Sequence, residues 1–303
     1  KWSPFHGALY AVIESVSKIA AAGGDYKKIR FTFQEYFERL GKDREKWGKP
    51  FSALLGALYA QKEFELPSIG GKDSMSGTFN ELNVPPTLIS FAVNTVNAEY
   101  VISSEFKAAG NNIYLIKHNV DDTFIPDIQE IKENYDYVHK NILEGNIISA
   151  MALKQGGIGE AASKMCFGNK IGAEINIEED EFFKLNYGAM IVESETELNN
   201  KNAVLIGKTI SSEEMRVNGE TIELSELIEN WESVLEMIFP PKLHMKTENI
   251  KEFTVKNNIY IEGTAAKVKF AKPRAGILVF PGNNCEYDTV RALENNGAVA
   301  NTV

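Results

Sequence analysis

A short glycine-rich segment holds the densest group of side chains that could do chemistry. Residues 70–77 read Gly-Gly-Lys-Asp-Ser-Met-Ser-Gly. Glycines let backbone N–H groups approach an anion closely, and a lysine supplies a point charge for phosphate. Asp73 could hold Mg²⁺ directly or through water, and the serines add hydroxyl groups. The candidate residues for binding a phosphate, a nucleotide or another substrate are therefore Gly70, Gly71, Lys72, Asp73, Ser74 and Ser76.

The same segment also permits a simpler interpretation. Its spacing does not match the Gly-x-x-x-x-Gly-Lys-Ser/Thr pattern of a P-loop. A glycine-rich turn before the next strand would need these residue types as well. The residue types alone leave phosphate binding and a plain turn both open.

Three other positions are weaker candidates. Gly156 and Gly157 precede a predicted helix, whose N-terminus could bind an anion, although a tight turn between strand and helix is the preferred interpretation. His6 lies just before another helix and could line a pocket, but a histidine with its hydrogen bonds satisfied is the more common case. No pair of histidines has the spacing of a zinc site.

Neither cysteine has the surroundings of a nucleophile. Cys285 follows a predicted strand, but no Gly-x-Cys-x-Gly elbow surrounds it. Cys166 lies on the apolar face of a predicted helix and is expected in the core.

The elements that would position these residues alternate between helices and strands. Apolar residues from Leu9 to Ala20 recur at helical spacing and end at a Gly-Gly pair. Thr32 as a cap, with Glu35 three residues later, predicts a second helix over 32–40, and a third fits 50–61. Residues 69–78 are expected to form a loop, and 87–93 a strand.

After a boundary near residues 98–110, the pattern predicts a mixed α/β or α+β unit. Its predicted strands are 112–117, 146–153, 171–177, 187–193 and 203–208. Its predicted helices are 128–144, one that opens at residue 156, and 224–239. Further on, a strand at 276–280 and a helix at 286–296 resemble the opening of a doubly wound domain.

Composition narrows the class of protein. The 303 residues carry a net charge of −10, which argues against a protein that follows a nucleic-acid backbone. No apolar run is long enough for a membrane span, and no signal peptide is evident. Two cysteines cannot build a disulfide framework, so a reducing cytoplasm is expected. The chain starts at Lys1 and ends just after the opening of a new domain, which predicts a piece of a longer protein.

Several strings together resemble one family. They are SPFHGALY from Ser3, GGKDSMSGT from Gly70, PPTLISFAV from Pro85, GGIGE from Gly156 and PGNNCEYD from Pro281. In this order and separation they resemble phosphoribosylformylglycinamidine synthase of purine biosynthesis, over essentially the whole chain. One departure is that Gln155 stands where many members have an aspartate, which puts a metal-ligand role at that turn in doubt.

The resemblance implies a domain arrangement. Residues 1–98 would be the C-terminal portion of an N-type domain like that of aminoimidazole ribonucleotide synthetase, and 99–240 a C-type domain. Residues 241–274 would be a linker, and 275–303 the truncated first strand and helix of a flavodoxin-like class I glutaminase domain. Another synthetase half and the rest of the glutaminase, with its nucleophile, would lie outside the chain.

The resemblance also implies an activity. The family is an ATP-dependent carbon–nitrogen ligase with glutamine as amido donor, and it uses ATP or ADP and Mg²⁺. ATP converts the formylglycinamide oxygen to an iminophosphate, which channelled ammonia attacks. Alternatives are a structural nucleotide-binding half without catalysis, or another synthetase of the same superfold, such as a selenophosphate synthetase or thiamine-monophosphate kinase. The glutaminase-like tail argues against the last of these.

Overall fold

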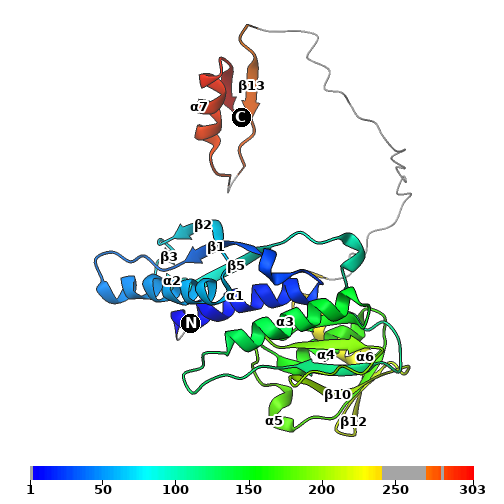
Figure 1. The fold of residues 1–303 in the computed structure, drawn as a ribbon. Helices are drawn as coiled ribbons and strands as arrows, with labels where there is room; N and C mark the ends of the chain where they lie inside the picture. The colour runs from blue at the N-terminus through cyan, green and yellow to red at the C-terminus, as the bar shows by residue number, and fades with distance from the viewer. Residues whose placement is uncertain (1–2, 241–270, 281–282) are drawn as a thin grey trace, which may run out of the picture. The chain divides into compact units, whose positions relative to one another are not determined.

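A computed structural model describes residues 3–240, 271–280 and 283–303 (Figure 1). The chain divides into two compact units, one up to Leu243 and one from His244, and each is described by itself. Most of the predicted linker and the Pro281-Gly282 dipeptide lie outside the described residues.

The first part of the larger unit is two helices against a three-stranded sheet. Helix α1 (Pro4–Ala21) begins at Ser3, whose hydroxyl accepts the His6 N–H. It packs along α2 (Arg44–Phe64). Strands β1 (Arg30–Tyr36), β2 (Ser68–Ser74) and β5 (Thr87–Val93) form the sheet in the order β2-β1-β5. The short elements here are η1 (Tyr26–Lys28), β3 (Thr78–Phe79), β4 (Leu82–Asn83) and η2 (Ala98–Tyr100).

Two sequence predictions in this region are wrong. The helix expected over 32–40 is strand β1, which pairs with β2 on one side and β5 on the other. Phe31 and Phe33 alternate with Thr32 and Gln34, and this period of two fits a central strand better than the Thr-x-x-Glu cap fits a helix. The loop expected over 69–78 is largely strand β2, because its backbone pairs in parallel with β1 despite the glycines.

The second part is a seven-stranded sheet in the order β12-β11-β8-β10-β6-β9-β7. Five of its strands match predicted ones: β6 (Asn112–Ile116), β7 (Ile147–Ala152), β8 (Gly172–Ile175), β9 (Met190–Ser194) and β10 (Ala203–Ile210). Strands β11 (Glu214–Val217) and β12 (Glu220–Glu223) and the short helix α5 (Glu179–Phe182) were not predicted. Short, polar elements like these carry little periodicity.

Helices cover both faces of this sheet. Tyr114 and Val192 share one apolar core with α1 and with α3 (Ile128–Leu143). Ile113 and Ile191 share a second core with α4 (Gly157–Phe167) and α6 (Leu224–Ser233). Because α1 also packs on β5, the first core joins the three-stranded and the seven-stranded sheets. The predicted domain boundary between residues 98 and 99 stays a prediction.

The smaller unit is a strand–helix–strand motif. Strands β13 (Arg274–Ile277) and β14 (Val299–Thr302) pair in parallel, with α7 (Glu286–Asn295) between them in the chain. Gly297 follows α7 with a φ of +85°, which a glycine adopts without strain at a helix end. The predicted strand and helix are thus present, and their assignment to the opening of a doubly wound domain stays a prediction.

Candidate functional site

The strand geometry of β2 divides the predicted phosphate-binding residues between two faces of the sheet. Side chains of successive strand residues point to opposite faces. Lys72 is in register with Gln34, and Ser74 with Tyr36, whereas Asp73 is in register with Glu35. Lys72 and Ser74 therefore lie on one face, and Asp73 lies on the other. The six predicted residues do not form a single cradle.

Helices α1 and α2 cover one face of the three-stranded sheet (Figure 1). Lys72 lies on the other, open face, which Gln34 and Tyr36 share. Its ammonium nitrogen is 4.6 Å from the centroid of the Tyr36 ring, a cation–π contact. The Tyr36 hydroxyl donates a 2.8 Å hydrogen bond to Gln34 Oε1. The lysine is exposed yet held by a neighbouring ring, so it presents a positioned positive charge to an anion.

Asp73 lies beside Glu35 on the face that the helices cover. Burial, and then the charge of Asp73, raise the pKa of the Glu35 carboxyl above its ordinary value. The two carboxyls border a groove of about 410 Å³ between α2 and β2. Apolar side chains line most of this groove, among them Phe33, Trp47 and Leu54. The groove thus combines an apolar surface with two acidic groups.

The two glycines of β2 have different reasons to be glycine. A Cβ at Gly71 would lie 2.7 Å from the Phe33 carbonyl oxygen, so the close packing of β2 on β1 requires the missing side chain. A Cβ at Gly70 would meet nothing within 4 Å. Of the two, Gly70 is the position where the backbone is open to a ligand.

His6 connects α1 to a loop of the second part. Its Nε2 donates to the Thr123 carbonyl oxygen at 2.9 Å, because a carbonyl can only accept. Its Nδ1 is then left to accept from the Ser3 hydroxyl at 2.6 Å. Both ring nitrogens therefore have partners, as the satisfied-histidine interpretation expects.

The Gly156-Gly157 turn is closed by its own helix. The Glu160 carboxylate accepts the Gly156 N–H at 2.9 Å and pairs with Lys164 at 2.6 Å. Gly157 has a φ of +60°, and a Cβ there would lie 2.7 Å from the Lys184 carbonyl oxygen. A tight turn accounts for both glycines, and Glu160 already occupies the place of an anion.

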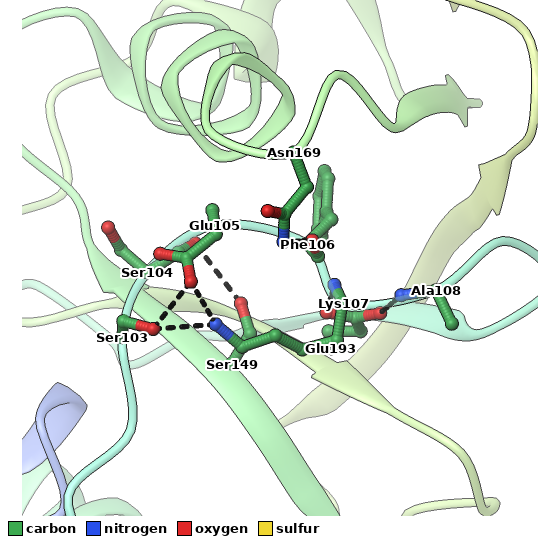
Figure 2. Close-up of polar contacts among 9 residues, drawn as sticks. All are labelled: Ser103, Ser104, Glu105, Phe106, Lys107, Ala108, Ser149, Asn169 and Glu193. Atoms are coloured by element: carbon green, nitrogen blue, oxygen red, sulfur yellow. Dashed lines mark hydrogen bonds and ion pairs between the residues drawn. The ribbon is translucent and has the colours of Figure 1, made fainter.

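Sequence reasoning missed Glu193, the most buried carboxylate among the described residues of the larger unit. Glu193 is fully buried in β9 and accepts from the Lys107 N–H at 2.8 Å and the Ala108 N–H at 3.2 Å (Figure 2). It also accepts from Asn111 Nδ2 at 2.8 Å. A buried carboxylate needs such donors, since an unpaired one would be very unfavourable. Its contacts fix the segment that leads into β6, so its role is structural. An acidic residue within an apolar strand was the available signal.

A second acidic group holds the same segment, nearer its start. The Glu105 carboxylate accepts from Lys107 Nζ at 2.5 Å and from the Ser103 hydroxyl at 2.6 Å (Figure 2). These bonds lower the pKa of Glu105 to about 2. Together with Glu193, this contact orders the crossing from the three-stranded to the seven-stranded sheet.

The described residues offer little support for a metal site or a reactive thiol. Among residues 3–240, 271–280 and 283–303, no group of three or more His, Cys, Asp or Glu side chains is placed to hold a metal ion. Both cysteines are unpaired. Burial raises the pKa of the Cys166 thiol to about 12, whereas Cys285 is exposed. None of the described helices is long and apolar enough to cross a membrane.

The known proteins with similar sequences include subunits of phosphoribosylformylglycinamidine synthase. The chain is 28% identical, over 265 residues, to phosphoribosylformylglycinamidine synthase subunit PurL of Limosilactobacillus reuteri. The match covers 77% of this chain and 35% of that relative, so the chain spans about a third of the relative's length. No protein-family model matches the chain.

Solved structures agree in fold. PurL of Thermotoga maritima, complexed with ATP, matches 75% of this chain and 42% of its own with a TM-score of 0.57 at 14% identity. The same protein has been solved with ADP and with FGAR. Thiamine monophosphate kinase from Aquifex aeolicus matches 74% of this chain and 84% of its own, with a TM-score of 0.53 at 13% identity.

The structural neighbours share the fold that the motifs implied, the mixed α/β fold of aminoimidazole ribonucleotide synthetase. The kinase is similar in fold alone, so the alternative of another synthetase is not better supported than the first interpretation. The predicted resemblance to phosphoribosylformylglycinamidine synthase is thus confirmed in sequence, and the predicted synthetase fold is confirmed in structure.

Proposed function

We propose that this chain is part of an ATP-dependent ligase that converts formylglycinamide ribonucleotide to formylglycinamidine ribonucleotide in the cytoplasm. The observation that carries the proposal is the similarity to PurL along 77% of the chain. The fold supports it, because the structural neighbours include PurL complexed with ATP and with FGAR.

The resemblance implies a two-step reaction. Phosphoryl transfer from ATP to the formylglycinamide oxygen gives an iminophosphate, and ammonia then displaces phosphate to form the amidine. Such a reaction depends on positioning the phosphates and stabilising their charge. The ammonia would come from glutamine through a glutaminase domain, of which β13, α7 and β14 would be the beginning.

We assign the phosphate contact of this chain to the open face of the three-stranded sheet. Lys72 supplies the charge, and the backbone at Gly70 is open to an approaching ligand. Ser74 lies on the same face, and Ser76 follows the strand. The ligand is ATP, ADP or the ribonucleotide phosphate. His6, Gly156 and Gly157 stay outside this assignment because their polar groups already have partners.

Asp73 and Glu35, the carboxylates of this part of the described structure, do not fit a Mg²⁺ ion shared with that phosphate. Mg²⁺ in such enzymes takes one or two carboxylates together with substrate phosphate oxygens. Asp73 and Glu35 are two carboxylates, but they lie on the face opposite Lys72. We therefore propose that the Mg²⁺ ligands for the Lys72 phosphate are groups other than Asp73 and Glu35.

A titration of nucleotide into the chain tests the assignment. Calorimetry with ADP or ATP and Mg²⁺ should give heat that the Lys72→Met variant loses, with affinity falling about tenfold or more because a charge-assisted contact is removed. Lys42→Met, an exposed lysine on the turn before α2, is the matched control and should bind as the unaltered chain does. Equal affinity of both variants would remove Lys72 from the site.

Activity assays test the wider proposal. The chain alone should neither hydrolyse glutamine nor form the amidine, because the glutaminase nucleophile and one synthetase half would lie outside it. Clear ammonia-dependent turnover by the 303-residue chain would contradict this division of labour.

A further inference from the structure

Among the described residues of the larger unit, three lysines hold the ammonium group over an aromatic ring. The distances from the ammonium nitrogen to the ring centroid are 5.5 Å for Lys27 and Tyr26, 5.8 Å for Lys164 and Trp231, and 4.6 Å for Lys72 and Tyr36. A cation is attracted to the face of a ring, and the attraction weakens with distance. Of the three, the Lys72 ammonium is therefore held most closely.

The three lysines differ in what else they contact. Lys27 pairs with Asp136 at 2.6 Å, and Lys164 pairs with Glu160 at 2.6 Å. Across the described residues, no carboxylate pairs with Lys72 and no oxygen accepts a hydrogen bond from it, so the protein leaves its three N–H donors unused. A ring attracts the charge without taking these donors. Lys72 thus combines a held position with a full set of donors.

Strand pairing keeps the nearest acidic groups away from Lys72. Asp73 and Glu35 are in register with each other and lie on the face that the helices cover, opposite Lys72. The residue in register with Lys72 is Gln34, and its Oε1 already accepts the Tyr36 hydroxyl at 2.8 Å. That hydrogen bond restricts the Tyr36 ring, and it engages an acceptor that could otherwise pair with Lys72.

This arrangement favours the binding of a phosphate group. A free lysine side chain has many rotamers, and a ligand that immobilises it must offset the loss of their entropy. A ring that already restricts the side chain lowers that cost. A carboxylate would restrict the side chain as well, but its ion pair with the lysine would have to break before a phosphate could bind.

We propose that Tyr36 is a positioning residue for Lys72, and that it holds the ammonium group ready for a phosphate on the open face of the three-stranded sheet. The ligand class is a phosphate monoester or a nucleoside di- or triphosphate, because three ammonium donors suit an anion with several unprotonated oxygens. The inference rests on the proposed function, which places the phosphate contact at Lys72.

Nuclear magnetic resonance tests the contact without any ligand. In a chain with ¹³C-labelled lysine, the ε-methylene protons of Lys72 should resonate upfield of those of lysines that contact no ring, because they lie over the Tyr36 ring. The Lys72→Met variant assigns the signal by its loss. Tyr36→Phe should keep the upfield shift, since it keeps the ring, and Tyr36→Leu should abolish it. An ordinary chemical shift for Lys72 in the unaltered chain would overturn the inference.

Calorimetry with ADP and Mg²⁺ tests what the contact does for binding. Tyr36→Leu should weaken binding about two- to fivefold, the factor expected for an exposed cation–π contact, and Tyr36→Phe should bind as the unaltered chain does. Trp231→Leu, which removes the ring beside Lys164, is the matched control and should leave the affinity unchanged. Tyr36→Thr gives the same test with a good strand former should leucine disturb the sheet.

The inference and the proposed function fail in different ways. If Lys72→Met loses nucleotide binding while Tyr36→Leu and Tyr36→Thr retain full affinity, Tyr36 does not position Lys72, and only the inference is wrong. If the unaltered chain gives no heat with ADP or ATP, the phosphate contact at Lys72 fails, and the inference that rests on it fails too.

Discussion

The two sheets of the larger unit differ in how they are covered. In β9, the neighbouring residues Ile191 and Val192 point to opposite faces, and both are fully buried. In β5, Ile89, Phe91 and Val93 share one face and are 38–55% exposed. Helices therefore cover both faces of the seven-stranded sheet at β9, whereas the three-stranded sheet has one face covered and one face open.

This difference indicates which apolar surfaces are covered by the helices of the chain itself. A sheet buried on both faces has its apolar residues satisfied by its own helices. A sheet with an open face, a free edge and a neighbouring apolar helix stripe has surface left for ligands or other polypeptide. The phosphate assignment at Lys72 lies in this less covered region.

The largest expected effect is a difference in the free energy of unfolding between two alanine variants, each at one apolar residue from one region. Ile191→Ala should lower the free energy of unfolding by about 2–5 kcal/mol, because it leaves a cavity in a closed core. Leu54→Ala should change it by no more than about 0.5 kcal/mol, because Leu54 is largely exposed in this chain. Urea unfolding followed by circular dichroism measures both. Similar losses for the two variants would show that Leu54 is packed after all.

A second contrast uses two glycines of the same helix. Gly56→Ala should destabilise the chain by about 1–3 kcal/mol, since the new Cβ would collide with the α1 backbone. Gly48→Ala meets nothing within 4 Å and should stabilise by about 0.5–1 kcal/mol through the better helix propensity of alanine. The measurement is the shift of the urea midpoint. Loss of stability in the Gly48 variant would indicate that the exposed start of α2 has a partner.

The covered region was also the easier one to predict from sequence. Its helices and most of its strands follow continuous apolar periodicity, as in α3 and in β6 to β10. In the other region, α1 and β5 were predicted, but β1 was assigned to a helix because a local capping pattern outweighed a period of two. Only the pairing of β1 with two neighbours, which is a long-range property, decides that case.

The sequence predicted which residues belong to the candidate site, but it did not predict on which face of the sheet each of them lies. Residue types pointed to Lys72 and Asp73 together, since both suit phosphate chemistry. Their assignment to a loop hid the alternation that places them on opposite faces of a strand. Glu35, the partner of Asp73, was counted as part of a helix cap. Side-chain direction depends on the element type, so one wrong element changed the geometry of the whole site.

The smallest expected effect concerns the segment that joins the two regions. The pKa of Glu105 is about 2 in the folded chain, below its ordinary value of 4.5. A lowered carboxyl pKa stabilises the fold above pH 4.5, and this contribution is lost as the pH falls from 4.5 toward 2. Because the Glu105 and Lys107 side chains are about 30% exposed, the contribution should not exceed about 1 kcal/mol.

Glu105→Gln measures this contribution directly. The unaltered chain should be the more stable of the two at pH 6, and the difference should vanish as the pH approaches 2. Lys107→Met should reduce the same difference, since it removes the ammonium group that lowers the Glu105 pKa. Glu99→Gln, an exposed carboxylate shortly before the segment, is the control and should leave the pH dependence as it is. A difference between the unaltered chain and Glu105→Gln that persists at pH 2 would mean that the side chain stabilises the crossing by shape and not by charge.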